Sequence, residues 1–406
     1  MNVLFISPGY PPEMPHFVRG FAEQGASIIG ISDTPYEQIP EHSRRHLSRY
    51  LRVPTLTNEA EAVAAVRDAI PPGLIDRVVC LWEPGVVLAA RLREALGVPG
   101  QRVEQAIAFR DKDVMKQVIR AAGLRTAKSA RASTSAEVVA ACEAFGFPVV
   151  IKPIDGAGSM DTFKIADAAE LPAALERLRH VPTVNVEEFI DGEEYHFDTI
   201  CADGKILYYH MGYYRPKPII SRHAEWISPQ TLSLRDVDAP ALQPGIALGK
   251  AVLEAMQFTT GFTHMEWFLT SKGEAIFSEI AARPPGANTV DLMNFGSDID
   301  VFRGYAEAEV HGTFSQPVVR KYNAINIFKR AQGPGRITRI EGMAGLMQRY
   351  GEHVVHVDLL PIGAPRRNWI QTLLSDGYVV IRHPDYAKAC EIADAFGTDL
   401  QLYAGG

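Results

Sequence analysis

Short apolar runs alternate with amphipathic, alanine-rich segments over the first hundred residues. Apolar runs predict strands at Val3–Ser7, Ser27–Ser32 and Arg77–Leu81, and amphipathic segments predict helices at Phe17–Gln24, Glu59–Ala69 and Val86–Leu96. This alternation predicts a parallel sheet with helices on its faces. Gly9 is followed by prolines at 11, 12 and 15, so the glycine fingerprint of dinucleotide-binding folds is absent here.

A smaller α/β unit follows from Arg110 onward. Helices are predicted at Asp111–Ala122 and at Ser135–Phe145, the second with Ser135 as N-cap and Gly146 at its end. The predicted strands are near Ala127–Ala132, then Pro148–Lys152, Thr162–Ile165 and Val184–Ile190.

Two strand pairs and a polar segment come next. The pairs are Tyr195–Cys201 with Lys205–Gly212, and Gly261–Leu269 with Ala275–Ile280. After residue 312, a strand at Ala324–Phe328, a helix at Gly342–Tyr350 and a strand at Tyr378–Ile381 predict a further α/β cap. We therefore expect an N-terminal α/β domain over 1–108, a central domain over 109–311 and a C-terminal cap over 312–406.

Composition excludes several classes of function. The chain has 41 basic and 48 acidic residues, a formal charge of −7, which disfavours nucleic acid or an anionic membrane as the main partner. No apolar stretch approaches the length of a membrane span, and the N-terminal run lacks the basic region of a signal peptide. The four cysteines form no CxxC pair, so we expect reduced thiols. A cytoplasmic enzyme is the default expectation, and a homodimer follows from base rates alone.

Two acids on neighbouring strands are candidate metal ligands. Glu266 and Glu279 lie on strands joined by a tight turn, so antiparallel pairing can place them opposite each other on one face. Facing carboxylates in apolar surroundings repel, and a divalent cation such as Mg²⁺ would relieve this. The alternatives are two solvent-facing acids or a pair with Arg283.

Two lysines and a glycine loop are candidates for phosphate binding. Lys152 ends an apolar strand and leads into the loop Asp155–Ser159, which contains Gly156, Gly158 and Ser159. Glycines let backbone N–H groups approach phosphate oxygens, and a lysine adds charge for the same atoms. Lys112 begins a helix, where an anion is also favoured. Both lysines could instead be ordinary surface residues.

The segment VEEFIDGEEY, Val186–Tyr195, is a candidate for nucleotide recognition. Backbone groups at Glu188 and Ile190 could pair with the edge of adenine, and Glu194 could bind ribose hydroxyls. A solvated acidic end of a strand pair is the alternative.

In this order, the motifs RDK, VVIKP with its glycine loop, VEEFIDGEE, HMEW and SEIAARPPG resemble the ATP-grasp superfamily over about residues 110–286. The resemblance implies an α/β fold with a mobile lid at about 125–188 that closes over ATP. It implies that Lys112 and Lys152 contact the α- and β-phosphates and that Arg283 contacts the transferred phosphoryl group or the acyl phosphate. Adenine would be held by Glu187, Glu188 and Ile190, the last two through the backbone, and ribose by Glu194. Glu266 and Glu279 would hold Mg²⁺, with Mn²⁺ as a substitute.

Within the superfamily the chain looks most like the carboxylate–amine ligases, including the L-amino acid ligases, with amino acids as expected substrates. Ala281 departs from the pattern, because many members have an asparagine there, and this leaves the number of ions open. A carboxylase, a purine-biosynthesis ligase and a non-catalytic nucleotide-binding regulator remain as alternatives. Basic residues of the polar segment are candidates for substrate or γ-phosphate contacts: Arg215, Lys217, Arg222 and His223.

Overall fold

The computed structural model describes residues 1–156, 158, 160–372 and 374–406. Its first part is a parallel sheet, as the sequence predicts, and its strand order is β3-β2-β1-β4. The strands are β1 Asn2–Ile6, β2 Ser27–Ser32, β3 Arg49–Arg52 and β4 Arg77–Cys80. The helices of this part are α1 Met14–Glu23, α2 Glu41–Arg44, α3 Glu59–Ala69 and α4 Val86–Leu96.

Side chains alternate across this sheet. Val3 and Phe5 of β1 pack with α1 and with α12 (Val301–His311), which returns from far along the chain. Leu4 and Ile6 face the opposite layer, where α3 and α4 lie. Helices therefore cover both faces, as a parallel sheet requires.

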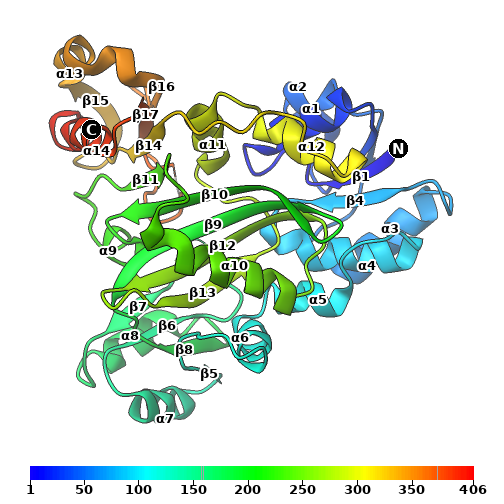
Figure 1. Ribbon diagram of the computed structural model, residues 1–406, viewed down its shortest axis with the longest axis horizontal. Helices are drawn as coiled ribbons and strands as arrows, with labels where there is room; N and C mark the ends of the chain where they lie inside the picture. The colour runs from blue at the N-terminus through cyan, green and yellow to red at the C-terminus, as the bar shows by residue number, and fades with distance from the viewer. Residues whose placement is uncertain (157, 159, 373) are drawn as a thin grey trace.

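A long antiparallel sheet forms the centre of the molecule, in the order β13-β12-β9-β10-β11-β14-β17-β16 (Figure 1). Its strands are β9 Gly192–Ala202, β10 Lys205–Arg215, β11 Gln230–Ser233, β12 Gly261–Thr270, β13 Ala275–Ala281, β14 Asn323–Phe328, β16 Val354–Leu359 and β17 Gly377–His383. The strands expected to build a C-terminal cap thus extend this central sheet, with β14 paired to β11. The helices of this central region are α5 Val103–Ala108, α6 Lys112–Ala121, α9 Pro218–Ser221, α10 Gln243–Ala255 and α11 Thr289–Ser297.

The expected lid is a separate antiparallel sheet, β5-β8-β6-β7, backed by two helices. Its elements are β5 Ser129–Ala132, α7 Ser135–Phe145, β6 Val149–Pro153, β7 Phe163–Ile165, α8 Leu171–Leu178 and β8 Val184–Glu188. The prediction of Ser135 as the N-cap of α7 was wrong. Thr134 caps the helix, because its hydroxyl accepts the Glu137 N–H while the Glu137 carboxylate accepts the Thr134 N–H.

The last part of the chain packs two helices on the far end of the central sheet. They are α13 Met343–Tyr350 and α14 Tyr386–Asp399, with the small sheet of β15 Arg336–Glu341 and β18 Gln401–Gly405 beside them. Across the described residues, no helix combines the length and apolar character needed to cross a bilayer. The boundaries expected at 108 and 311 stay predictions.

Candidate active site

A cleft lies between the lid sheet and the central sheet, and it encloses about 800 Å³ with its open mouth included. Apolar side chains on its walls, such as Val150, Phe189 and Phe268, suit a flat aromatic ring. Most of the predicted site residues line it: Lys112, Lys152, Gly156, Glu187, Glu188, Ile190, Glu194, Glu266 and Glu279. Gly158 and Arg283 are not among the lining residues that the structure describes, and Ser159 lies outside the described residues.

Glu266 and Glu279 stand directly opposite each other on β12 and β13, so the predicted pairing is confirmed. A shift in register follows Glu266, and β-bulges of this kind re-aim side chains near functional sites. Burial alone would raise the pKa of Glu279, but lysines at 112, 152 and 116 lower it to about 2. Glu279 is therefore held as a carboxylate.

Glu194 adds a further acid to the same cleft. Burial first, and then the charge of Glu266, raise its pKa to about 8. No lysine or arginine of the described chain forms an ion pair with Glu194, although the charges of Lys152 and Lys217 lower its pKa. Carboxylate oxygens with incompletely balanced charge fit a hard divalent cation, so the residues present suit Mg²⁺ or Mn²⁺. The assignment of Glu266 and Glu279 as metal ligands stays a prediction.

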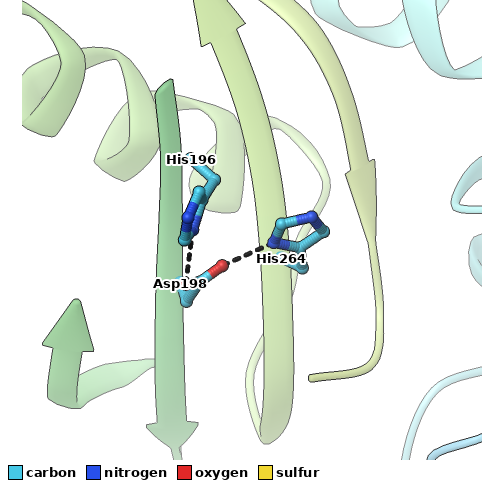
Figure 2. Close-up of side chains that lie close together, drawn as sticks. All are labelled: His196, Asp198 and His264. Atoms are coloured by element: carbon cyan, nitrogen blue, oxygen red, sulfur yellow. Dashed lines mark hydrogen bonds and ion pairs between the residues drawn. The ribbon is translucent and has the colours of Figure 1, made fainter. Parts of the chain in front are cut away.

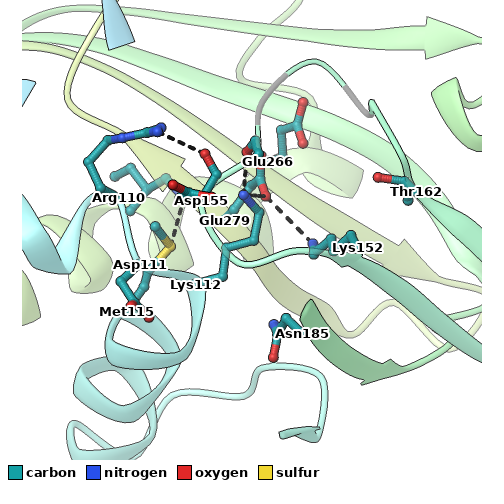
Figure 3. A network of polar contacts seen from close by, with 12 residues as sticks. Arg110, Asp111, Lys112, Met115, Lys152, Asp155, Thr162, Asn185, Glu266 and Glu279 are labelled. Carbon is teal, nitrogen blue, oxygen red and sulfur yellow. Dashed lines mark hydrogen bonds and ion pairs between the residues drawn. The ribbon is translucent and has the colours of Figure 1, made fainter. Parts of the chain in front are cut away.

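The two predicted phosphate-binding lysines converge on Glu279 (Figure 3). Lys112 Nζ and Lys152 Nζ each lie 3.5 Å from Glu279 Oε2, the first from the start of α6 and the second from the end of β6. Asp111 caps α6 by accepting the N–H groups of Asp113 and Val114, which holds Lys112 at the helix N-terminus. Lys112 also donates to the carbonyl oxygen of Gly156 at 2.5 Å, so it bridges the glycine loop and the central sheet.

The residues expected around adenine occupy one wall of the cleft. Ile190 packs with Ala127 and Ile276. The Glu188 carboxylate accepts hydrogen bonds from Arg125 and from the Lys128 N–H, and the Glu188 N–H donates to the Lys128 carbonyl. The Glu187 carboxylate is already engaged, because it accepts Asn185 at 2.6 Å and pairs with two lysines.

Arg283 lies at the contact between the N-terminal sheet and the central region. Its Nε donates to Glu83 Oε2 at 2.7 Å, and Arg110 holds the other oxygen of Glu83 at 2.6 Å. Glu83 follows β4, so the arginine expected at the phosphoryl group is held by a residue of the N-terminal part of the chain. Its predicted contact with the phosphoryl group or acyl phosphate stays a prediction.

Of the polar segment between 214 and 234, Lys217 lines the cleft. Arg222 donates to the carbonyl oxygens of Gly158 and Ile370, which ties the glycine loop to the C-terminal part. Arg215 instead pairs with Asp394 of α14, and His223 packs its ring against Phe163.

Sequence reasoning missed a buried histidine cluster beside Glu266. Asp198 accepts from Nδ1 of His196 at 2.8 Å and from Nδ1 of His264 at 2.6 Å (Figure 2). It also accepts from Nδ1 of His210 on β10, at 2.8 Å. His196, Asp198 and His264 lie close enough to share an ion, but their separations are those of hydrogen bonds. The Nε2 of His264 lies 3.5 Å from Glu266, which also accepts the Tyr214 hydroxyl at 3.2 Å. The sequence did contain a signal for this cluster. His196 and Asp198 are two residues apart in one strand, as are His264 and Glu266 in another, so each pair points to one face of the sheet.

Burial lowers the pKa of His210, whereas Asp198 and Glu266 outweigh burial and raise the pKa of His264 to about 9. The pKa of Asp198 lies well below its usual value, because the histidines outweigh its burial. The pair of Asp198 and His264 is therefore charged and supports Glu266 from behind.

Comparison with known proteins places this cleft in a family. Residues 117–294 match the protein family described as "ATP-grasp domain". The chain contains an ATP-grasp domain. This domain includes β6, β8, β12 and β13, and all the residues found to line the cleft except Lys112 lie within it.

Several curated relatives are ligases. The chain is similar to "L-arginine-specific L-amino acid ligase" of Bacillus subtilis, with 27% identity over 319 residues, 77% of this chain and 76% of the relative. It is 25% identical to "Alanine--anticapsin ligase" of Bacillus subtilis, over 62% of this chain and 61% of that relative. It is 30% identical to "D-alanine--D-alanine ligase" of Mycolicibacterium gilvum (strain PYR-GCK), over 50% of this chain and 58% of that relative.

Solved structures show the same fold. An L-amino acid ligase from Bacillus licheniformis superposes with a TM-score of 0.80 at 19% identity, covering 100% of this chain and 99% of the other. A phosphoribosylglycinamide synthetase from Anaerococcus prevotii has a TM-score of 0.71 at 15% identity, with the same coverage. The family match shows an ATP-grasp domain, and the curated relatives named above that share it are ligases.

Proposed function

We propose that the chain uses ATP to join two amino acids, with formation of a peptide bond and release of ADP and phosphate. One observation carries the proposal: Glu266 and Glu279 face each other in a cleft into which Lys112 and Lys152 also point. Carboxylates for a divalent cation and ammonium groups for phosphates are what phosphoryl transfer from ATP needs. The amino-acid substrates are proposed from the ligase relatives.

The reaction has two steps. A carboxylate oxygen of one amino acid attacks the γ-phosphorus of ATP, the bond to the bridging oxygen of ADP breaks, and an acyl phosphate forms. The amino nitrogen of the second amino acid then attacks the acyl carbon, phosphate leaves, and the nitrogen loses a proton. A divalent cation held by Glu266 and Glu279 would offset the negative charge that develops on the phosphates.

The chain's own groups would position the reactants and exclude water. Lys112 and Lys152 would hold phosphate oxygens, and Glu194 would accept a ribose hydroxyl. The main-chain groups of Ile190 and Glu188 would pair with adenine. The lid would cover the nucleotide and keep water from the acyl phosphate.

The test is release of phosphate from ATP and Mg²⁺ in the presence of single amino acids and amino-acid pairs, with the product identified by mass spectrometry. We expect phosphate and dipeptide in equal amounts for at least one pair. Lys152→Met should weaken ATP binding on the order of tenfold or more, since a close ammonium–phosphate contact is lost. Lys205→Met, at an exposed turn between β9 and β10, is the matched control.

Two outcomes would favour the alternatives. Turnover that requires bicarbonate in place of the amino-acid carboxylate would indicate a carboxylase. Tight ATP binding without phosphate release for any pair would indicate a nucleotide-binding regulator.

A further inference from the structure

A third lysine, Lys116, lies beneath the nucleotide cleft and belongs to none of the recognised motif positions. It follows Lys112 by one turn of α6, and its side chain is 0% exposed. It does not line the cleft, so it cannot reach a nucleotide directly. Burying an ammonium group is costly unless an anion compensates it, which makes its partner informative.

That partner is Glu187. Lys116 Nζ lies 2.5 Å from Glu187 Oε1, and Lys152 Nζ lies 3.2 Å from the same oxygen. The contact of Lys116 is an ion pair without hydrogen-bond geometry, and its Nζ has no hydrogen-bond partner among the described residues. Lys152 then reaches Glu279, which Lys112 approaches from the other side. Cations and anions therefore alternate in one row from Lys116 to Lys112.

The row has one consequence for Lys152. Lys152 contacts two carboxylates, Glu187 and Glu279, and the row as a whole holds three lysines and these two acids, so one positive charge remains beside the cleft. Without Lys116 the charges of the row would cancel where a phosphate must bind. Burial lowers the pKa of Lys116 to about 8 despite Glu187, so the cost of burial falls on this lysine.

We propose that Lys116 is a positioning residue of the nucleotide site: it neutralises Glu187 from behind, so that Glu187 orients Lys152 without cancelling its charge toward the phosphates of the bound nucleotide. This inference rests on the proposed use of ATP. It also gives the Glu187 carboxylate a role other than binding adenine.

The experiment measures displacement of a fluorescent ADP analogue by ADP and by adenosine. Lys116→Met should weaken ADP binding on the order of tenfold, because the charge of Lys152 is then cancelled. The affinity for adenosine, which has no phosphates, should change by less than about twofold. The double variant Lys116→Met/Glu187→Gln removes one cation and one anion, so it should recover most of the ADP affinity. When Lys116→Met is combined with Lys152→Met, the ADP affinity should fall little below that of Lys152→Met alone, since both substitutions act through the charge of Lys152.

Lys329→Met is the matched control, because Lys329 is also buried, at 2% exposure, but bonds Ser228 and the Phe396 and Gly397 carbonyls far from the cleft. It should leave the ADP affinity unchanged even if it lowers the melting temperature. Equal losses for ADP and adenosine in Lys116→Met, or no recovery in the double variant, would overturn the inference and leave the ligase proposal standing. Failure of the unaltered protein to bind ADP at all would overturn both.

Discussion

Replacement of Glu279 by glutamine should change nucleotide binding and turnover in opposite directions. Lys112 Nζ and Lys152 Nζ each lie 3.5 Å from Glu279 Oε2. Unit charges at that distance attract by about 4–5 kcal/mol at an effective dielectric of about 20. The Glu279 side chain is 28% exposed, so screening and solvation leave a much smaller net value, about 1–2 kcal/mol.

If Lys112 and Lys152 bind phosphates as proposed, the carboxylate of Glu279 competes with those phosphates when no divalent cation is bound. Glu279→Gln should therefore bind ADP about tenfold more tightly in EDTA, as measured by calorimetry. In Mg²⁺ the same variant should lose ATP turnover, because a proposed metal ligand is gone. Glu274→Gln, which removes an exposed acid from the β12–β13 turn, should change neither quantity. Weaker ADP binding in EDTA, or normal turnover in Mg²⁺, would refute the reasoning.

Further predictions concern stability. Asp198→Asn should cost about 3–5 kcal/mol in urea unfolding, because a charged histidine loses its buried counter-ion; a loss below 1 kcal/mol would contradict the cluster. Burial and a neighbouring carboxylate raise the pKa of Asp291 to about 7, so the folded state binds this proton more tightly than the unfolded state. The stability that the protonated Asp291 contributes is thus lost as pH rises from about 4 to 7. At pH 8 the variant Asp291→Asn should be more stable than the unaltered protein by up to about 3 kcal/mol, and at pH 4 the two proteins should have similar stability. Equal effects at both pH values would refute this. Gly245→Ala should destabilise, because an added Cβ would lie 2.1 Å from the Trp267 ring, whereas Gly345→Ala in α13 has open space and should not. Equal melting temperatures for these two variants would contradict the packing argument.

Local patterns determined much of the fold. The strand Ser27–Ser32 and the helices Glu59–Ala69 and Val86–Leu96 have the predicted bounds, because each shows its period and stop signal within its own residues. The helix α12 was not predicted. It is buried between the N-terminal and central sheets on most of its surface, so it lacks the polar face that marks an amphipathic helix.

The sequence alone determined the pairing of Glu266 with Glu279, since a tight turn leaves two adjacent strands few registers. It also placed Lys112 and Lys152 near that pair through the order of the motifs. Only the tertiary structure decided which distant groups meet them: Lys116 beneath Glu187, Glu83 on Arg283, and three histidines around Asp198. It likewise joined β14 to β11 and so made the expected cap part of the central sheet. The physical reason is that periodicity records which face of an element is buried, whereas the partner on that face depends on how separate elements pack.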